Sequence, residues 1–162
     1  MKKVGIIMGS DSDLPIIRKS VDLLRELEIP FEVHIYSAHR TPDQARDFAA
    51  TARVNGFGVL IAAAGMAAHL AGSIAANTTL PVIGIPCKGP VFDGMDALLS
   101  TVQMPSGIPV AAVGVNNGSN AALLAAEILS VEDTALADRL QKKRFKDTEA
   151  VLAKDADVIS RL

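Results

Sequence analysis

The stretch Val4-Gly5-Ile6-Ile7-Met8-Gly9-Ser10-Asp11-Ser12-Asp13 joins an apolar run to a short polar segment. A helical pattern follows over Leu14–Leu27, where apolar residues recur at spacings of three and four. Asp13 lies where an N-cap is expected, and Pro15 falls in the first turn of this helix. The stretch therefore predicts a buried strand, a polar loop and a core-facing helix in succession.

The same alternation continues along the chain. Further strand-like runs lie at Phe31–Tyr36, Val59–Ala63, Val82–Pro86 and Val110–Val115. Helical patterns separate them at Pro42–Val54, Ala67–Ala76 and Asp93–Thr101. Strands that alternate with helices indicate a parallel sheet with right-handed crossovers. We therefore predict an α/β protein with a three-layer, doubly wound parallel sheet, formed by residues 1–162 as a single domain.

The C-terminal part of the sequence indicates subunit association. The helical segment Ala121–Leu129 is apolar nearly all round, and such a helix needs cover on every side. Residues 131–162 form a charged helical tail with only a thin apolar stripe. The tail is either a solvated terminal helix or packs on a neighbouring subunit. We expect a homo-oligomer.

Composition excludes several classes of protein. The net charge of −2 and the pI near 5.9 provide no basic surface for nucleic acid. A single cysteine excludes an internal disulfide and suits the cytoplasm. The uncharged segment Gly58–Asn77 is rich in Ala and Gly, so a strand followed by a helix describes it better than a membrane span. The apolar run ending at Met8 is too short for a signal peptide.

Three polar clusters follow the first three predicted strands. Since the carboxyl ends of parallel strands meet at one edge of the sheet, these clusters are expected to form one ligand site. In the first cluster, Ser10 and Ser12 can donate to phosphate oxygens, and Asp13 can accept from ribose hydroxyls. This cluster matches neither the Rossmann glycine pattern nor a P-loop, and taken alone it also describes an ordinary turn.

The second cluster, Ser37-Ala38-His39-Arg40-Thr41-Pro42, is more specific. A guanidinium such as that of Arg40 binds phosphate through two parallel hydrogen bonds. Histidine is the side chain best suited to acid–base chemistry near neutral pH, so His39 is the candidate catalytic residue. This pair therefore predicts that the site binds a phosphate group and transfers a proton.

The third cluster, Gly65-Met66-Ala67-Ala68-His69, begins a helix of small residues. The backbone N–H groups of Gly65 and Met66 can face a ligand carboxylate, with His69 beside them. His69 could equally be a core histidine whose hydrogen bonds are all made within the protein. His34 lies within a strand and is interpreted as structural.

Two further loops, Lys88–Gly94 and Gln103–Pro109, are expected to close the pocket because they are rich in Gly and Pro. The three histidines are scattered and only one cysteine is present, so no metal site is predicted. Cys87 has no adjacent histidine to activate it and is interpreted as a passive small residue.

These motifs, together with Gln103-Met104-Pro105-Ser106-Gly107-Ile108-Pro109 and Asn120–Ala126, resemble the PurE-type N5-carboxyaminoimidazole ribonucleotide mutases of purine biosynthesis. The resemblance covers nearly the whole chain. It implies a flavodoxin-like subunit in a homo-octamer that uses no cofactor and no metal. It also implies an isomerase that moves a carboxylate from N5 of its ribonucleotide substrate to C4 of the imidazole ring.

The resemblance also assigns roles to residues. It implies that the ribose phosphate is bound by Ser10, Asp13 and Arg40, with help from Ser12 and Ser37. His39 would shuttle the proton. The carboxylate pocket would be lined by Gly65, His69 and Leu70.

The residues suit this reaction. A carbamate loses CO2 once its nitrogen is protonated, and the freed CO2 must stay trapped until C4 attacks it. A base must then remove the C4 proton to restore aromaticity. One imidazole can perform both proton transfers in turn, and a small, mostly apolar pocket can hold CO2.

The sequence departs from the mutase pattern at two positions, where Ala71 replaces a usual proline and Met66 a common glycine. The nearest alternative is a sister group that carboxylates aminoimidazole ribonucleotide directly with CO2. That group tends to have Lys in place of Arg40 and lacks the Gly-x-Ala-x-His pattern ending at His69, so the mutase is favoured. A non-catalytic nucleotide-binding module would not need His39. A flavin-binding protein is disfavoured by the absence of Trp and the single Tyr.

Overall fold

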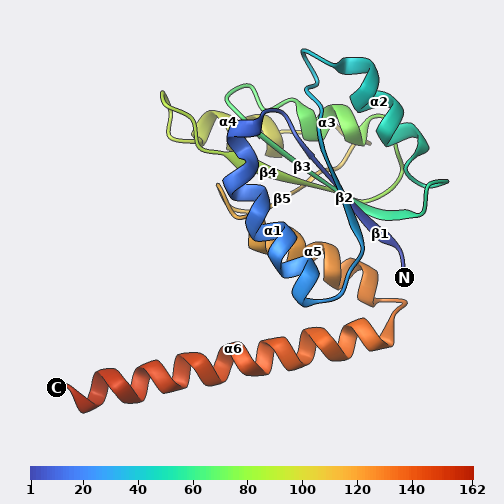
Figure 1. Ribbon diagram of the computed structural model, residues 1–162. Coiled ribbons are helices and arrows are strands. Elements are labelled where there is room, and N and C mark those ends of the chain that lie inside the picture. The colour runs from blue at the N-terminus through green and yellow to red at the C-terminus, as the bar shows by residue number, and fades with distance from the viewer.

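A computed structural model describes residues 1–162 and contains one parallel sheet (Figure 1). The strand order is β2-β1-β3-β4-β5, which is the order of flavodoxin-like folds. All neighbouring strands pair in parallel. The strands are β1 (Lys3–Met8), β2 (Phe31–Ile35), β3 (Phe57–Gly65), β4 (Val82–Cys87) and β5 (Ala111–Ala112). The predicted doubly wound fold is confirmed.

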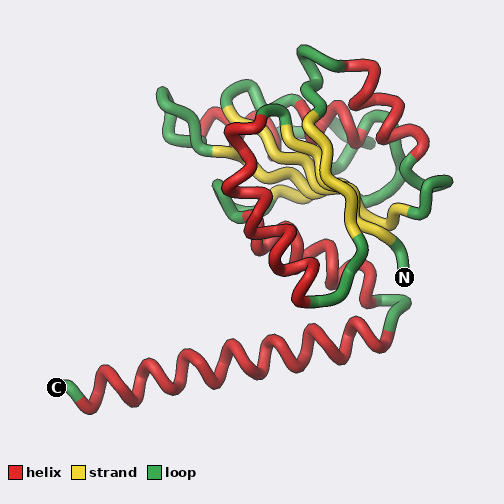
Figure 2. The backbone as a smooth tube through the Cα atoms, in the orientation of Figure 1, coloured by secondary structure: helices red, strands yellow, loops and turns green.

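Helices cover both faces of the sheet and create three layers (Figure 2). One face is covered by α1 (Leu14–Glu26) and α5 (Gly118–Ser130), which pack against each other. The other face is covered by α2 (Pro42–Thr51), α3 (Leu70–Ala75) and α4 (Met95–Val102). The chain ends in α6 (Thr134–Ser160).

The sheet separates two hydrophobic cores, one between each of its faces and the helices that cover that face. Because side chains alternate along a strand, Ile6 and Ile61 point toward α1 and α5, whereas Ile7 and Leu60 point toward α2 and α3. All four of these side chains are fully buried. Ala, Val, Ile and Leu dominate both cores, as the low aromatic content of the sequence requires.

Several predicted boundaries are corrected by the structure. The fifth strand pairs only over Ala111–Ala112 rather than over Val110–Val115. The third helix begins at Leu70 rather than at Ala67, because Met66 has a positive φ of 55° and a tight turn follows it. Asp13 makes no side-chain capping bond, because its carboxyl is buried beside β4 instead.

The expectation that α5 needs cover from another subunit is also wrong. Ala121 and Ala125 are fully buried within the chain, and from Ala121 to Ser130 only Glu127 is exposed. The cover comes from α1, the sheet and the first turns of α6.

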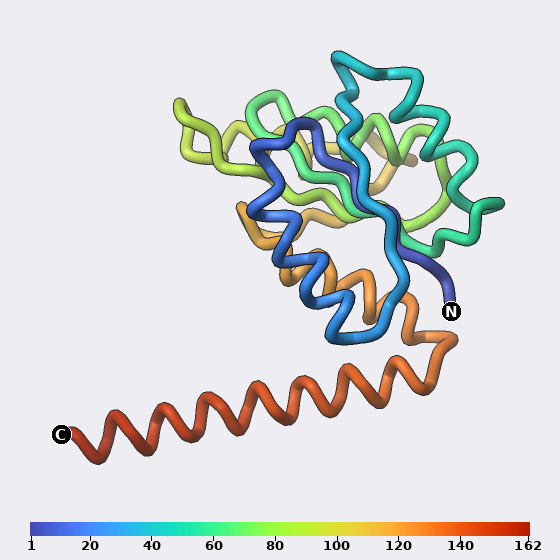
Figure 3. Tube along the Cα trace, in the orientation of Figure 1, coloured from blue at the N-terminus to red at the C-terminus, as the bar shows by residue number.

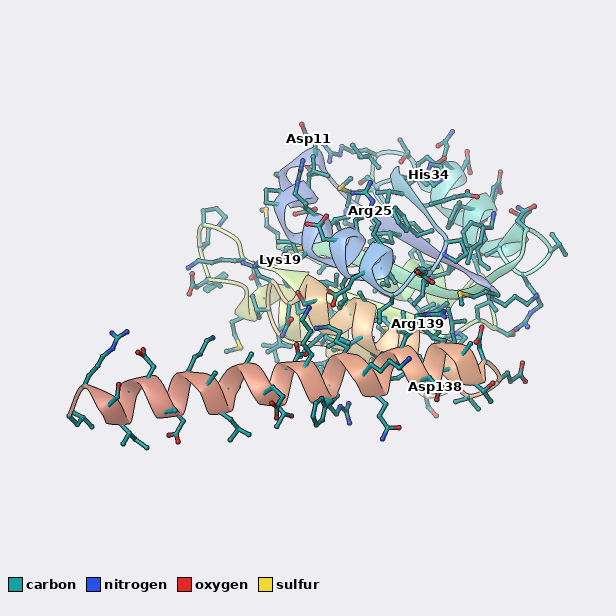
Figure 4. The ribbon with its side chains drawn as sticks, turned by 60° about the horizontal axis from the view of Figure 1, so that its bottom comes forward. Asp11, Lys19, Arg25, His34, Asp138 and Arg139 are labelled. Atoms are coloured by element: carbon teal, nitrogen blue, oxygen red, sulfur yellow. The ribbon has the colours of Figure 1, made fainter.

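The tail α6 is a single helix that extends past the body of the molecule (Figure 3). Only Leu136 of this helix is buried, and the Arg139 Nε donates to the Leu27 carbonyl oxygen at 3.0 Å. Contact with the body extends to Arg144, whose Nη2 donates to the Glu127 Oε1 at 3.0 Å. Beyond this residue, side chains project freely from both edges of the helix (Figure 4). None of the helices, α6 included, has the length and apolar character that crossing a bilayer requires.

Candidate active site

The loops that leave the carboxyl ends of β1, β2, β3 and β4 surround a pocket of about 610 Å³. These loops gather at the upper edge of the sheet in Figure 2. All nine residues that the sequence assigned to the site line this one pocket: Ser10, Ser12, Asp13, Ser37, His39, Arg40, Gly65, His69 and Leu70. The sequence therefore located the pocket, although their individual roles remain predictions.

The pocket also contains residues that had no assigned role. These are Gly9, Ala38, Ala64, Ala67, Lys88, Gly89 and Pro90. Met66, whose backbone N–H was expected to face a ligand carboxylate, lines the pocket as well. Lys88, Gly89 and Pro90 belong to the β4–α4 loop, which was expected to close the pocket. The sequence could not predict that the alanines line the pocket, because a small side chain lines a pocket only where two loops happen to face each other.

The loop between β2 and α2 is held by hydrogen bonds to its own backbone. The Ser37 Oγ accepts from the backbone N–H groups of His39 at 3.3 Å and Arg40 at 3.1 Å. The Thr41 Oγ1 accepts from the Ser37 N–H at 2.8 Å. Ser and Thr favour such turns because their hydroxyls replace a backbone partner. Both functional side chains are thereby presented on an ordered turn.

Arg40 connects this loop to the first polar cluster. Its Nη2 donates to the Gly9 carbonyl oxygen at 2.7 Å. A guanidinium has five N–H donors in a fixed fork, so the remaining donors are available to a ligand. The bond to Gly9 orients the fork at the pocket edge, where an anion would meet it.

The imidazoles of His39 and His69 lie face to face. Their ring centroids are 5.8 Å apart and the angle between the ring planes is 20°. His69 is exposed and lies at the N-cap position of α3, so its interpretation as a core histidine is wrong. The structure places two groups capable of proton transfer within one site.

The polar cluster after β1 forms a short 3-10 turn, η1 (Asp11–Asp13), in which the Ser10 Oγ accepts weakly from the Ser12 N–H at 3.4 Å. Asp13 is the one acidic residue among the buried side chains. Burial raises the pKa of the Asp13 carboxyl, and the Cys87 thiol opposes this shift by donating a hydrogen bond to it.

Cys87 lies at the end of β4 and is only 1% exposed. Burial, followed by the nearby negative charge of Asp13, raises the pKa of the Cys87 thiol to about 12. The thiolate is the reactive form of cysteine, so this environment suppresses reactivity. These properties agree with the interpretation of Cys87 as a passive residue.

The segment Gln103–Pro109 does not reach the pocket in the single chain, so this expectation was wrong. Gly107, Ile108 and Pro109 instead line a separate hollow near Arg53. The reason is topological. This segment leads from α4 into β5, and loops entering parallel strands lie at the opposite edge of the sheet from loops leaving them.

Outside the pocket, His34 lies on β2 with its ring stacked on Tyr36 at 4.9 Å, which fits its interpretation as structural. No three His, Cys, Asp or Glu side chains come close enough together to hold a metal ion.

We predict that Cys87 resists alkylation in the folded protein. A pKa rise from 9.0 to about 12 lowers the thiolate fraction near pH 8 roughly 1,000-fold. Iodoacetamide should therefore label native protein at least about 1,000-fold more slowly than protein unfolded in urea, as followed by mass spectrometry. Because Cys87 is the only cysteine, one adduct reports on this site alone. Equal rates in both states would contradict the burial described above.

Comparison with known proteins places the chain in a family. Residues 3–150 match the model of the AIR carboxylase family. An N5-carboxyaminoimidazole ribonucleotide mutase of Pyrococcus abyssi is 52% identical, over 89% of this chain and 83% of that protein. A phosphoribosylaminoimidazole carboxylase of Saccharomyces cerevisiae is 50% identical over 93% of this chain, which spans only 26% of the yeast protein.

Solved structures agree with this placement. The crystal structure of Treponema denticola PurE superposes with a TM-score of 0.82 at 30% identity, and covers 95% of this chain and 96% of that one. By the extent of the family match and the identity to its members, the chain belongs to the AIR carboxylase family.

Proposed function

We propose that this protein is an N5-carboxyaminoimidazole ribonucleotide mutase of de novo purine (IMP) biosynthesis. It is an isomerase that moves the carboxylate from N5 to C4 and yields 4-carboxy-5-aminoimidazole ribonucleotide. The observation that carries the proposal is the pair of facing imidazoles, His39 and His69, in the pocket that also contains Arg40. Relatives at 47–52% identity that carry the mutase name support it.

The phosphate end of the substrate is bound by the loops after β1 and β2. Arg40 supplies a positive charge and oriented N–H donors, while Ser10, Ser12 and Ser37 supply hydroxyl donors. Asp13 accepts from a ribose hydroxyl.

The chemistry takes place beside the imidazole pair. His39 donates a proton to N5, and the N5–carboxylate bond breaks with its electron pair going to nitrogen, which releases CO2. C4 then attacks CO2 and forms the new C–C bond. Neutral His39 next removes the C4 proton, so the ring regains its aromaticity and the imidazole is ready for another cycle.

The carboxylate end of the pocket is lined by Gly65, His69 and Leu70. His69 supplies a hydrogen-bond donor to the carboxylate before and after transfer. No step in this sequence requires a cofactor or a metal ion, since proton transfer and CO2 capture account for every bond that changes.

Direct carboxylation of aminoimidazole ribonucleotide with CO2 is the second candidate. The yeast relative named phosphoribosylaminoimidazole carboxylase favours it, because its identity to this chain is nearly as high as that of the mutases. Arg40 and the Gly-x-Ala-x-His pattern favour the mutase. A non-catalytic nucleotide-binding module would have no use for His39 at its position in the pocket.

We further propose that residues 1–162 act as one domain in a cytoplasmic homo-octamer that binds neither nucleic acid nor membrane. Support for assembly comes from exposed apolar side chains in two regions. On and just before α4 they recur at helical spacing, at Phe92, Met95, Leu99 and Val102. On α6 they are Phe145, Val151, Leu152, Val158 and Ile159. A soluble monomer rarely exposes this much apolar surface, and closed symmetry would cover it.

The function is tested by supplying substrates separately to the purified protein at low bicarbonate. A mutase forms 4-carboxy-5-aminoimidazole ribonucleotide from the N5-carboxylated substrate alone, as measured by chromatography. A direct carboxylase forms the same product from aminoimidazole ribonucleotide and added bicarbonate, without the ATP-dependent carboxylating enzyme. Product only in the second reaction would reject the mutase.

His39→Asn should lower turnover by at least about 100-fold while substrate still binds, because it removes the proton donor and leaves the phosphate contacts intact. Turnover and substrate affinity are measured separately, by chromatography and calorimetry. His34→Asn makes the same exchange outside the pocket and should keep most of the activity. Near wild-type turnover in His39→Asn would show that another group moves the proton.

Arg40→Ala should weaken substrate binding, because it removes a charge-assisted phosphate contact worth roughly 1.5–3 kcal/mol. This corresponds to a rise in KM of roughly 10- to 150-fold. A dephosphorylated substrate should no longer distinguish the variant from wild type. Arg46→Ala is the matched control, since Arg46 pairs only with Asp43 and Asp47 of its own helix. An unchanged KM in Arg40→Ala would exclude the phosphate role.

Light scattering on the purified protein should give a mass near eight times that of the 17.0 kDa chain. The exposed apolar residues of α4 and α6 supply the driving force. A mass near that of the single chain would refute the assembly. Truncation after Ser130 removes α6 and should reduce both the mass and the activity, whereas a fully active truncated protein would make α6 a solvated appendage.

A further inference from the structure

Met66 combines two unfavourable properties at the edge of the pocket. Its backbone has a φ of +55°, in the left-handed region that glycine adopts freely and other residues adopt at a cost. Its large apolar side chain is nevertheless 60% exposed. Strained non-glycine residues persist where the surrounding structure or the function requires them. The side chain of Met66 therefore needs an explanation beyond the path of the backbone.

The backbone of Met66 forms the turn that presents His69. The Met66 carbonyl oxygen accepts from the Ala68 N–H at 2.9 Å, and the Ala67 carbonyl oxygen accepts from the His69 N–H at 2.7 Å. A glycine at position 66 would allow the same turn without strain. The turn alone does not explain a methionine.

The side chain of Met66 reaches from one pocket loop to the next. A Cβ atom added to Gly89 would lie 3.6 Å from the Met66 Cγ, so the two residues are neighbours across the β3–α3 and β4–α4 loops. Both residues line the pocket. The strands that carry these loops are paired up to Gly65 and Cys87, which keeps the loop bases together. Met66 thus spans the gap between two adjacent walls.

The surroundings of Met66 are small and apolar. The pocket residues nearest to it in sequence are Ala64, Gly65 and Ala67, and Pro90 follows Gly89 on the facing loop. The one charged residue of the facing loop in the pocket, Lys88, has its ammonium group paired with the Asp93 carboxylate. CO2 is uncharged and needs no hydrogen-bond donor, so an apolar cover suits it better than it suits the phosphate or the carbamate.

We propose that Met66 is a specificity-determining residue whose side chain covers the CO2-holding part of the pocket. The inference rests on the proposed mutase function and deepens it. Once the N5–carboxylate bond breaks, CO2 either reacts with C4 or escapes and leaves aminoimidazole ribonucleotide behind. The thioether slows the escape, and the product ratio is the quantity that it controls.

Three substitutions separate the side chain from the backbone. Met66→Gly removes the side chain and relieves the strain, whereas Met66→Ala removes most of it and keeps the strain. Met66→Leu retains an apolar side chain of similar volume and is the matched control. Thermal unfolding of each variant confirms folding, and the Gly variant has no reason to melt below wild type by more than a few degrees.

The experiment supplies N5-carboxylated substrate labelled with ¹³C at its carboxylate, in buffer with unlabelled bicarbonate. Mass spectrometry measures released aminoimidazole ribonucleotide against C4-carboxylated product, with enzyme-free decomposition subtracted, and the ¹³C retained in that product. In Met66→Gly and Met66→Ala the released fraction should rise roughly fivefold relative to product, the change that about 1 kcal/mol in a barrier produces. Retained ¹³C should fall in both, and Met66→Leu should behave as wild type.

The outcomes are distinguishable. Suppose that wild type forms product, and that both truncated variants show the wild-type ratio of released aminoimidazole ribonucleotide to product and the wild-type retention of ¹³C. Met66 then does not retain CO2, and the inference is wrong. If Met66→Ala leaks and Met66→Gly does not, lost cover is not the cause, because Met66→Gly removes more of the side chain, and the inference is rejected. A wild-type protein that forms no product from this substrate would reject the proposed function itself.

Discussion

Parallel pairing of β1 with both β2 and β3 is the constraint on which the site depends. In the paired register Met8 lies opposite Ile35 on one side and Ala63 on the other, so β1 and β2 end together and β3 continues two residues farther, to Gly65. The ladder continues into the loops, where the Gly9 N–H donates to the Ala63 carbonyl oxygen at 3.1 Å. Arg40 then bonds to the carbonyl of the same Gly9. Backbone hydrogen bonding thus connects the sheet directly to Arg40 and the polar loop after β1.

Different loops supply the polar and the apolar groups of the pocket. The loops after β1 and β2 carry the hydroxyls and the guanidinium, whereas those after β3 and β4 carry mainly small and apolar residues around His69. The two imidazoles lie where these halves meet, because His39 belongs to the loop after β2 and His69 to the loop after β3. A reaction that turns a carboxylate into CO2 and back requires both environments within one site.

Much of this arrangement could be predicted from residue pattern alone. Alternating runs predicted the sheet, and polar clusters at strand ends predicted which loops meet, because parallel topology leaves few options. The predictions that were wrong concerned contacts that depend on three-dimensional packing. The side chain of Asp13 is buried beside Cys87 instead of capping a helix, and α5 is covered by α1 and α6. Gln103–Pro109 resembles a lid in composition, but its place before β5 puts it at the far edge. The strain at Met66 has no signature in residue type.

The start of β1 at the amino edge of the sheet has a practical consequence for protein engineering. Lys3 begins the strand and Gly9 follows its end, so the strand of six residues separates them by about 20 Å. A tag, tether or second folded unit joined ahead of Lys3 would enter on the side away from the pocket. Immobilisation through that end would leave substrate access unobstructed, whereas attachment through the loops after β1 to β4 would block it.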